Sequence, residues 1–306
     1  SLTAEIGDCE ALEVLSMKNT QISEFPPEIS KLSKLKKILA ENWHSALEHK
    51  VWIQRLPKGF GKLSSLTELN LAANDMVELS EEIGELKNLK VLTLHNNKLT
   101  ALPEALTDCI KLAELDVFNN KIKSLPENIG KLKNMKRLQV GSNLIKEIPA
   151  SIGQLTKLAY FFTGYNLLES LPAEIGQLVN LKRFYINENN LKTIPVEIGK
   201  CTSLSEFNLG NKGGRKSGIS TLPEEMGNMT SLKRIGLSNH NIKHIPDSFG
   251  ELKELDDLDL KDNPIEYIPE ALANRGTNLW IRVTKKQANA LKGKISQRLM
   301  DTLQVD

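Results

Sequence analysis

The chain has 306 residues, of which 40% are hydrophobic and 25% are charged, and its formal net charge is +2. This near-neutral balance argues against a general electrostatic affinity for nucleic acid or for a membrane surface. No apolar run approaches about 18 residues, so the sequence predicts no membrane-spanning helix. The composition is typical of a soluble folded chain.

One pattern repeats along most of the chain with a period of 23 residues. In the unit that starts at Leu112, an L-x-x-L-x-L segment precedes an asparagine, a Leu-Pro pair and an I-G pair. The alternation in the first segment predicts a short strand. The proline and the glycine predict one short helical turn on the return limb. Because a single unit cannot bury its own apolar face, the repetition predicts a solenoid.

An asparagine recurs at the same position of six successive units. These residues are Asn74, Asn97, Asn120, Asn143, Asn166 and Asn189, each 23 after the one before. An amide side chain both donates and accepts hydrogen bonds, so it can satisfy backbone groups of neighbouring turns that have left the sheet. We therefore expect a buried ladder of asparagines.

The pattern begins in mid-repeat, since Leu2-Thr3 aligns with the Leu-Pro pair of later units. No amphipathic segment precedes it, although the ends of a solenoid need a cap. We therefore expect the chain to be a fragment of a longer protein. The first full unit starts at Leu12 and has Thr20 in the asparagine position.

The second unit breaks the period, because Leu35 and Leu66 are 31 residues apart. The surplus lies in AENWHSALEHKVWIQR, near residues 40–55, and brings Trp43, His44, His49 and Trp52. Two interpretations remain open: a binding loop with aromatic anchors, or a longer loop folded on its own tryptophans. We expect no metal site, because no cysteine or carboxylate cluster accompanies the histidines.

The ninth unit also contains extra residues, because Leu204 and Leu232 are 28 apart. The surplus lies in GNKGGRKSGIS, near residues 210–219. It resembles a phosphate-binding P-loop, but Arg215 stands where the second glycine belongs, and the repeat resumes where a long helix should follow. We expect no nucleotide there; the loop is either a flexible basic segment or a basic rim for an acidic partner.

The chain ends with a segment outside the repeat pattern. Residues 280–283 read as a last strand, and Thr284-x-x-Gln287 is a capping box for a helix. The apolar face of that helix consists of Ala288, Leu291, Ile295 and Leu299. We predict a solenoid of about eleven full repeats over 1–283 and a C-terminal capping helix over 284–306. A partner-binding or dimerising helix is the alternative.

The three cysteines occupy one position of the repeat, the last apolar residue before the strand. Cys109 and Cys201 are 92 residues apart, which is four periods, and Cys9 is at the same place in its unit. Cysteines four repeats apart lie roughly 19 Å from one another, too far for a disulfide. We expect three buried, unpaired thiols.

These motifs resemble the intracellular leucine-rich-repeat proteins with the 23-residue consensus LPxxIGxLxxLxxLxLxxNxL. That group includes Ras-suppressor and Ras–Raf scaffold proteins, plant Ras-group repeat proteins and similar bacterial proteins. The resemblance runs from about Leu2 to about Val283. It implies an α/β leucine-rich-repeat solenoid, curved as a horseshoe, with a parallel sheet on the concave side and short helical turns on the convex side. It suggests small GTPases or phosphatases as partners, but no residue here matches their contacts.

We find no catalytic constellation and predict no enzyme activity, cofactor or metal. The outward positions of the strands are more informative, because aromatic and arginine side chains converge there. The predicted partner-binding residues are Phe118, Arg137, Tyr160, Phe162, Tyr165, Arg183 and Tyr185. Exposed aromatics with arginine are typical of an interface core. Mutual stacking without a partner is the alternative.

We therefore predict a non-enzymatic module or scaffold in signalling that binds a protein partner on its concave face. We expect a cytoplasmic monomer that binds neither nucleic acid nor membrane, with secretion as the other possibility for its location. Two alternatives remain: a recognition region of a larger enzyme (a kinase, GTPase or ligase), and a bacterial protein that interacts with a host.

Overall fold

The structure of the protein is a computed structural model that describes residues 2–20, 22–42, 52–211, 218–274 and 279–305. The chain divides into two compact units, Ser1–Ile145 and Lys146–Asp306. Most of the first insertion, including Trp43, His44 and His49, lies outside the described residues. So does the P-loop-like segment at 212–217.

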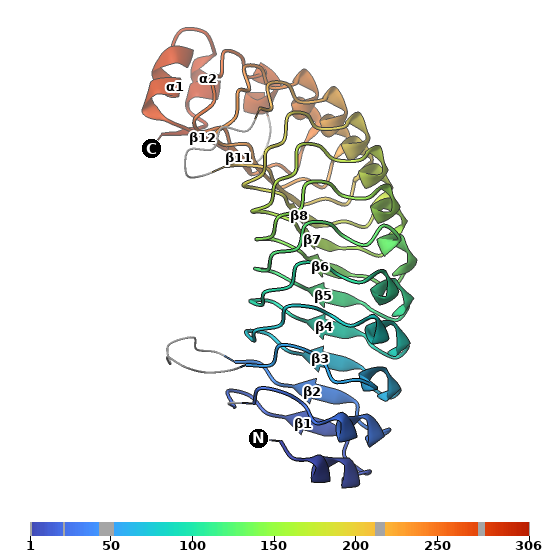
Figure 1. Ribbon diagram of the computed structural model, residues 1–306. Coiled ribbons are helices and arrows are strands. Elements are labelled where there is room, and N and C mark those ends of the chain that lie inside the picture. The colour runs from blue at the N-terminus through green and yellow to red at the C-terminus, as the bar shows by residue number, and fades with distance from the viewer. Residues whose placement is uncertain (1, 21, 43–51, 212–217, 275–278, 306) are drawn as a thin grey trace. The chain divides into compact units, whose positions relative to one another are not determined.

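The first unit is a stack of short parallel strands in chain order, with 3₁₀ turns along the opposite side of the stack (Figure 1). Its strands are β1 (Val14–Ser16), β2 (Lys37–Leu39), β3 (Glu68–Asn70), β4 (Val91–Thr93), β5 (Glu114–Asp116) and β6 (Arg137–Gln139). Its 3₁₀ helices are η1 (Ala4–Asp8), η2 (Pro27–Lys31), η3 (Phe60–Lys62), η4 (Glu81–Glu85), η5 (Glu104–Asp108) and η6 (Ile129–Lys131).

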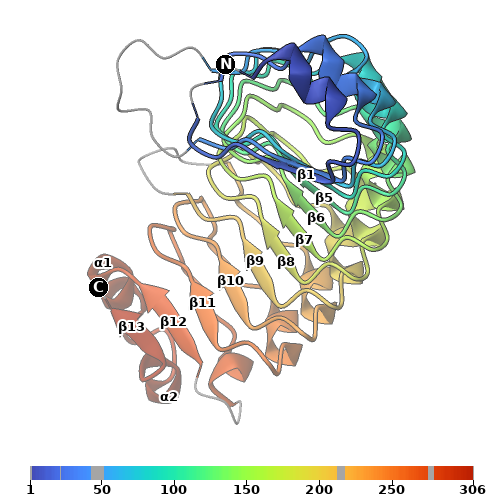
Figure 2. The same cartoon turned by 90° about the horizontal axis from the view of Figure 1, so that it is seen from below.

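The second unit continues the same plan of parallel strands in chain order, shown in yellow-green to red in Figure 2. Its strands are β7 (Tyr160–Phe162), β8 (Arg183–Tyr185), β9 (Glu206–Asn208), β10 (Arg234–Gly236), β11 (Asp257–Asp259), β12 (Trp280–Val283) and β13 (Leu303–Val305). Its 3₁₀ helices are η7 (Ala150–Gln154), η8 (Ala173–Gln177), η9 (Val196–Lys200), η10 (Glu224–Asn228), η11 (Asp247–Glu251) and η12 (Glu270–Asn274). Two α-helices complete it: α1 (Lys285–Leu291) and α2 (Gln297–Met300).

The core of each unit lies between its strands and its 3₁₀ turns. The central residue of each strand from β2 to β12 points into this core and is buried, as Leu115 of β5 and Leu258 of β11 illustrate. The residues before and after it point to the other face of the sheet, which we call the open face. Adjacent strands pair in register, for example Leu92 opposite Leu115. The predicted leucine-rich-repeat solenoid, with its parallel sheet and short helical turns, is therefore confirmed within each unit.

The asparagine ladder is also confirmed, because all six predicted members are at most 9% exposed. Asn120 illustrates the bonding. Its Nδ2 group donates to Leu94 O at 3.0 Å and to Val117 O at 3.1 Å. Its Oδ1 accepts a hydrogen bond from the backbone N–H of Leu99 at 3.0 Å. The amide thereby satisfies backbone groups that the three-residue strands leave unpaired.

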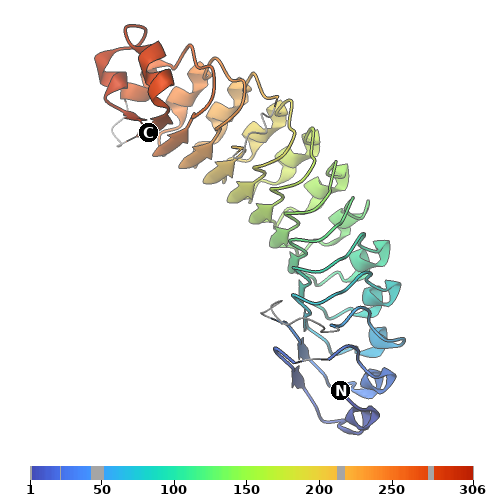
Figure 3. The same cartoon turned by 60° about the vertical axis from the view of Figure 1, so that its left-hand side comes forward.

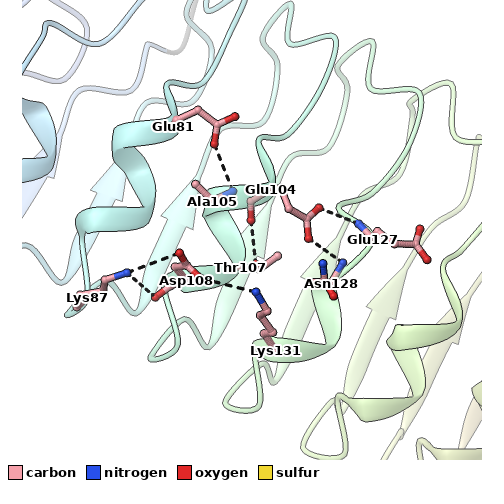
Figure 4. Close-up of polar contacts among 9 residues, drawn as sticks. All are labelled: Glu81, Lys87, Glu104, Ala105, Thr107, Asp108, Glu127, Asn128 and Lys131. Carbon is pink, nitrogen blue, oxygen red and sulfur yellow. Dashed lines mark hydrogen bonds and ion pairs between the residues drawn. The ribbon is translucent and has the colours of Figure 1, made fainter.

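The outer turns of the first unit are linked by carboxylates that reach from one repeat to the next (Figure 4). Pro103 stands at the N-cap of η5 and provides no side-chain cap. Instead, Glu81 Oε2 of the preceding turn accepts from the backbone N–H of Ala105 at 3.4 Å. Glu104 accepts in turn from Glu127 N–H and Asn128 N–H at 3.0 and 2.9 Å. Backbone N–H groups at the start of these two turns thus find acceptors in the neighbouring repeat.

The C-terminal segment differs from the single helix that the sequence predicts. The capping box at Thr284 and Gln287 is confirmed, but α1 ends before Gly293, whose φ of +77° is left-handed. A second helix, α2, then leads into β13, which pairs with β12 (Figure 3). Glycine adopts this conformation readily, which explains why the helix stops there. The domain boundary at 284 stays a prediction.

Gln287 also makes hydrogen bonds to the preceding repeat, which the sequence pattern does not reveal. Its Nε2 group donates to Leu260 O at 2.7 Å and to Asn263 O at 2.9 Å. Its Oε1 atom accepts from Thr284 N–H at 2.8 Å. Leu291 and Leu299 are fully buried, whereas Ile295 is partly exposed.

None of the helices in the described ranges has the length and apolar character that crossing a bilayer requires.

The prediction for the cysteines is correct for two residues and wrong for the third. Cys109 and Cys201 are buried free thiols, and Cys9 is exposed. The Sγ of Cys109 lies 3.0 Å from Ile83 O, in the preceding repeat. Burial raises the pKa of Cys109 to about 11 and that of Cys201 to about 12.

Candidate functional site

The predicted partner-binding residues fall in both units. Phe118 and Arg137 belong to the first unit, and Tyr160, Phe162, Tyr165, Arg183 and Tyr185 belong to the second. The predicted residues therefore form two groups, one on the open face of each unit.

In the first unit, a chain of polar contacts connects β5 and β6. Arg137 Nη2 donates to Gln139 Oε1 at 3.0 Å, and Gln139 Nε2 donates to Asp116 Oδ2 at 2.8 Å. The other oxygen of Asp116 accepts from the backbone N–H of Phe118 at 3.0 Å. Burial raises the pKa of Asp116 above its ordinary value. Phe118 and Arg137 are both partly exposed on this face.

In the second unit, three aromatic rings gather on the open face of β7 and β8. The ring centroids of Tyr160 and Tyr185 are 5.7 Å apart, with an edge-to-face angle of 62°. The centroids of Phe162 and Tyr185 are 6.2 Å apart. All three side chains are partly exposed. We call Tyr160, Phe162 and Tyr185 the aromatic cluster.

The strands that carry this cluster are held by a second set of aromatic residues on the inside. Phe161 and Phe184 stack with centroids 5.2 Å apart and an interplanar angle of 6°. Phe184 and Phe207 stack similarly at 5.4 Å and 10°. All three inner rings are buried. Because side chains alternate along a strand, this stack sets the direction of the outward neighbours of each phenylalanine.

A carboxylate joins the aromatic cluster to two arginines. Glu206 Oε1 lies 3.5 Å from Arg183 Nε and 3.6 Å from Arg234 Nη1. Its Oε2 accepts a hydrogen bond from the hydroxyl of Tyr185. Burial, together with this bond to Glu206, raises the pKa of Tyr185 to about 12. Tyr185 is therefore a neutral hydrogen-bond donor at physiological pH, and its ring is held in place by its hydroxyl.

Tyr165 adopts an unusual backbone conformation. In most repeats, the residue before the ladder position is left-handed, with φ between 52° and 58°. Asparagine occupies this position four times, at Asn19, Asn96, Asn119 and Asn239, as expected from its tolerance of this region. Tyr165 and Glu188 have larger side chains than asparagine and share the conformation, with φ of 58° and 57°. The left-handed conformation is therefore a property of the repeat, and at this position Tyr165 is 50% exposed.

A hollow of about 380 Å³ lies beside the aromatic cluster on the open face of the second unit. Tyr165 and Tyr185 contribute to its lining, together with polar and charged residues of β9 to β12. Gly210 and Gly236 contribute only backbone. A Cβ at these positions would come within 2.5 Å of Ser238 Oγ and Asn208 Oδ1, respectively.

Sequence reasoning identified the aromatic residues but missed the charged lining of the hollow. The missed residues are Glu206, Arg234, Ser238, Asp257, Asp259 and Arg282. The signal that points to them is the pair of glycines in outward positions, Gly210 and Gly236, because side chains occupy most of the equivalent positions. Within the described residues, no group of three or more histidine, cysteine or carboxylate side chains is arranged to hold a metal.

Comparisons with known proteins agree with this architecture. A family model for a leucine-rich repeat region matches residues 1–118. A search of curated protein sequences gives no match. The chain therefore has a leucine-rich-repeat fold, and proteins with this fold generally serve as protein-interaction modules.

Among solved structures, the chain is similar to the plant peptide hormone receptor RGFR1 in complex with RGF2, at 25% identity and a TM-score of 0.76. The match covers 99% of this chain and 52% of the receptor chain, so this chain spans about half of the receptor's length. A leucine-rich-repeat protein of Leptospira interrogans is 26% identical, with a TM-score of 0.50 and coverage of 99% and 98%. An internalin of Listeria monocytogenes shares the fold at 18% identity, with a TM-score of 0.64 and coverage of 99% and 88%.

Proposed function

We propose that this chain is a non-enzymatic protein-interaction module that binds an extended segment of a protein partner on the open face of its second unit. The observation that carries this proposal is the aromatic cluster. Its rings point away from the core, so packing of the repeats does not require them. Aromatic side chains beside arginine are the composition that interfaces favour.

The geometry of the cluster suits a binding surface. Tyr185 contacts Tyr160 and Phe162 and is anchored to Glu206, so its ring loses little freedom when a partner binds. The neighbouring hollow adds polar groups that can orient a main chain. The solved complex of RGFR1 with RGF2 supports a peptide-like ligand, because that receptor is 25% identical to this chain.

We also propose partner contacts for Phe118 and Arg137 on the open face of the first unit. The network of Arg137, Gln139 and Asp116 presents a guanidinium group whose orientation is fixed by a hydrogen bond. Guanidinium groups of this kind pair well with carboxylates. This contact is independent of the aromatic cluster and is tested by its own variant, Arg137→Ala.

The test is selection of binding peptides from a displayed library of random linear peptides, with the intact chain as bait. The variant Tyr160→Ala/Phe162→Ala/Tyr185→Ala removes the aromatic cluster. The matched control is Val179→Ala/Val196→Ala, which removes two side chains of the outer turns that are 47% and 49% exposed. Thermal unfolding of each variant verifies its fold.

We expect the parent chain and the control to enrich common peptides, and the aromatic variant to lose them. Loss of one central anchor costs about 2 kcal/mol or more, or roughly thirtyfold in affinity. The proposal fails if nothing is enriched on the parent chain, or if the folded aromatic variant retains the same peptides.

We further propose that the chain is a cytoplasmic monomer of the intracellular 23-residue repeat group and binds neither nucleic acid nor membrane. The support is the repeat period and the net charge of +2. Light scattering of the purified chain with and without a reducing agent tests the oligomeric state, because a monomer is expected in the reduced sample.

A further inference from the structure

The hollow beside the aromatic cluster contains acceptors that lack partners. Asp257 Oδ2 pairs with Arg282, but Asp257 Oδ1 is buried and has no hydrogen-bond partner among the described residues. A buried acceptor without a donor is unfavourable by about 1–3 kcal/mol. The Asp257 side chain as a whole is 19% exposed, so a ligand in the hollow can contact this carboxylate.

Asp259 lies two residues further along the same strand and also faces the hollow. It accepts one hydrogen bond, from the backbone N–H of Lys261 at 3.1 Å. Burial raises its pKa above the ordinary value, although Lys261 and Arg282 lie near enough to oppose this effect. The ionised form of Asp259 is thus incompletely solvated, and a cation in the hollow would stabilise it.

Ser238 supplies a second, independent indication of a ligand. It lines the hollow, is only 9% exposed, and its hydroxyl has no hydrogen-bond partner among the described residues. Nearly all buried polar side chains are hydrogen-bonded in folded proteins. An unpartnered hydroxyl in the lining of the hollow indicates a place for a polar group from outside.

The charge of the lining favours a cation. Four carboxylates and two guanidinium groups line the hollow: Glu188, Glu206, Asp257, Asp259, Arg234 and Arg282. Both arginines are already paired, Arg234 with Glu206 and Arg282 with Asp257. The ring of Tyr185 also lines the hollow, and aromatic faces attract cations.

We infer that this hollow receives a basic side chain, the guanidinium or ammonium group of an arginine or lysine in the partner segment. The inference rests on the proposed function and specifies the chemistry of its ligand. The carboxylates of Asp257 and Asp259 accept hydrogen bonds from the cation. Apolar residues of the same segment then contact the aromatic cluster.

The test uses the same displayed library of random linear peptides and measures the amino-acid composition of the peptides that each protein selects. Asp257→Asn/Asp259→Asn removes the negative charges, and Gly236→Ala narrows the hollow at the cost of a shift of the Asn208 side chain. Gly236 is in ordinary strand conformation, so this second variant should fold. Glu251→Gln, on an outer turn with its side chain 74% exposed, is the matched charge control.

We expect peptides selected on the parent chain and on the control to be enriched in arginine or lysine next to aromatic or apolar residues. On Asp257→Asn/Asp259→Asn and on Gly236→Ala, the basic residues should fall to their library frequency while the apolar enrichment persists. Enrichment without basic residues on the parent chain, or unchanged basic enrichment on both variants, overturns this inference and leaves the proposed function intact. No enrichment on the parent chain overturns both.

A single enriched peptide then gives a quantitative measure. Replacing its basic residue by norleucine should weaken binding to the parent chain about tenfold or more, as expected for loss of a close charge pair. The same replacement should change binding to Asp257→Asn/Asp259→Asn less than about twofold. Equal losses on both proteins would show that the basic residue binds elsewhere.

Discussion

Strands β7 to β9 carry aromatic residues on both faces, and the two sets differ in what holds them. The inner rings, Phe161, Phe184 and Phe207, are stacked and no more than 1% exposed. The outer rings of the aromatic cluster meet at tilted or edge-to-face angles and stay partly exposed. The inner set therefore contributes mainly to folding. The outer set is only partly buried, and we propose that it contributes to binding.

Truncating one ring on each face tests whether the inner and outer rings contribute differently to stability. Phe184→Ala should lower the free energy of unfolding by about 3–5 kcal/mol, because it leaves a cavity between two stacked rings. Phe162→Ala, the matched control on the open face, should cost much less. Urea denaturation measures both. Similar losses for the two variants would mean that the outer ring is also part of the core.

A buried histidine in the ladder makes stability depend on pH. His240 is 1% exposed, and its Nε2 lies 3.0 Å from Leu209 O. Burial lowers the pKa of His240 from 6.5 to about 4. Between these values the unfolded chain binds the proton and the folded chain does not, so stability is complete above pH 6.5 and falls as the pH approaches 4.

The loss should reach about 3 kcal/mol at the lower end of this range. Urea denaturation at a series of pH values measures it. His240→Asn should flatten the dependence, because asparagine is the usual ladder residue. His244→Asn, which changes a histidine whose side chain is 67% exposed, should not. A parent slope that survives in His240→Asn would assign the effect to other groups.

The ladder asparagines should contribute less than a core ring and more than an exposed one. Asn189 donates to Thr163 O and Ile186 O at 3.1 and 2.9 Å and accepts from Leu168 N–H at 2.9 Å. Asn189→Ala should destabilise by about 1–3 kcal/mol, because these buried groups lose their partners. Asn190→Ala changes the exposed neighbour and should have almost no effect on the urea midpoint. Equal midpoints for the two variants would contradict a structural role for the ladder.

The smallest effect on stability is expected on the open face. Tyr160→Ala loses an edge-to-face contact with Tyr185, which is worth about 0.5–1.5 kcal/mol. Tyr160→Phe keeps the ring and its contact with Tyr185, so it should lose less stability than Tyr160→Ala in thermal unfolding. If Tyr160→Ala instead unfolds as readily as Phe184→Ala, the distinction between the two faces is lost.

The sequence by itself determined the repeat, the parallel strands and the ladder. Each of these depends on a pattern within one unit of 23 residues, and the same pattern returns unit after unit. Asn120 and Leu115 could therefore be assigned their positions without coordinates. The outward direction of Tyr160, Phe162 and Tyr185 followed from the same alternation.

Only the tertiary structure decided which side chains of different repeats meet. The bonds from Glu206 to Tyr185 and two arginines depend on rotamers across three strands. The hollow depends on Gly210 and Gly236 lying beside Ser238 and Asn208. Contacts between repeats are not periodic, because the exposed residues vary while the core residues do not, and this is why the site needed the structure.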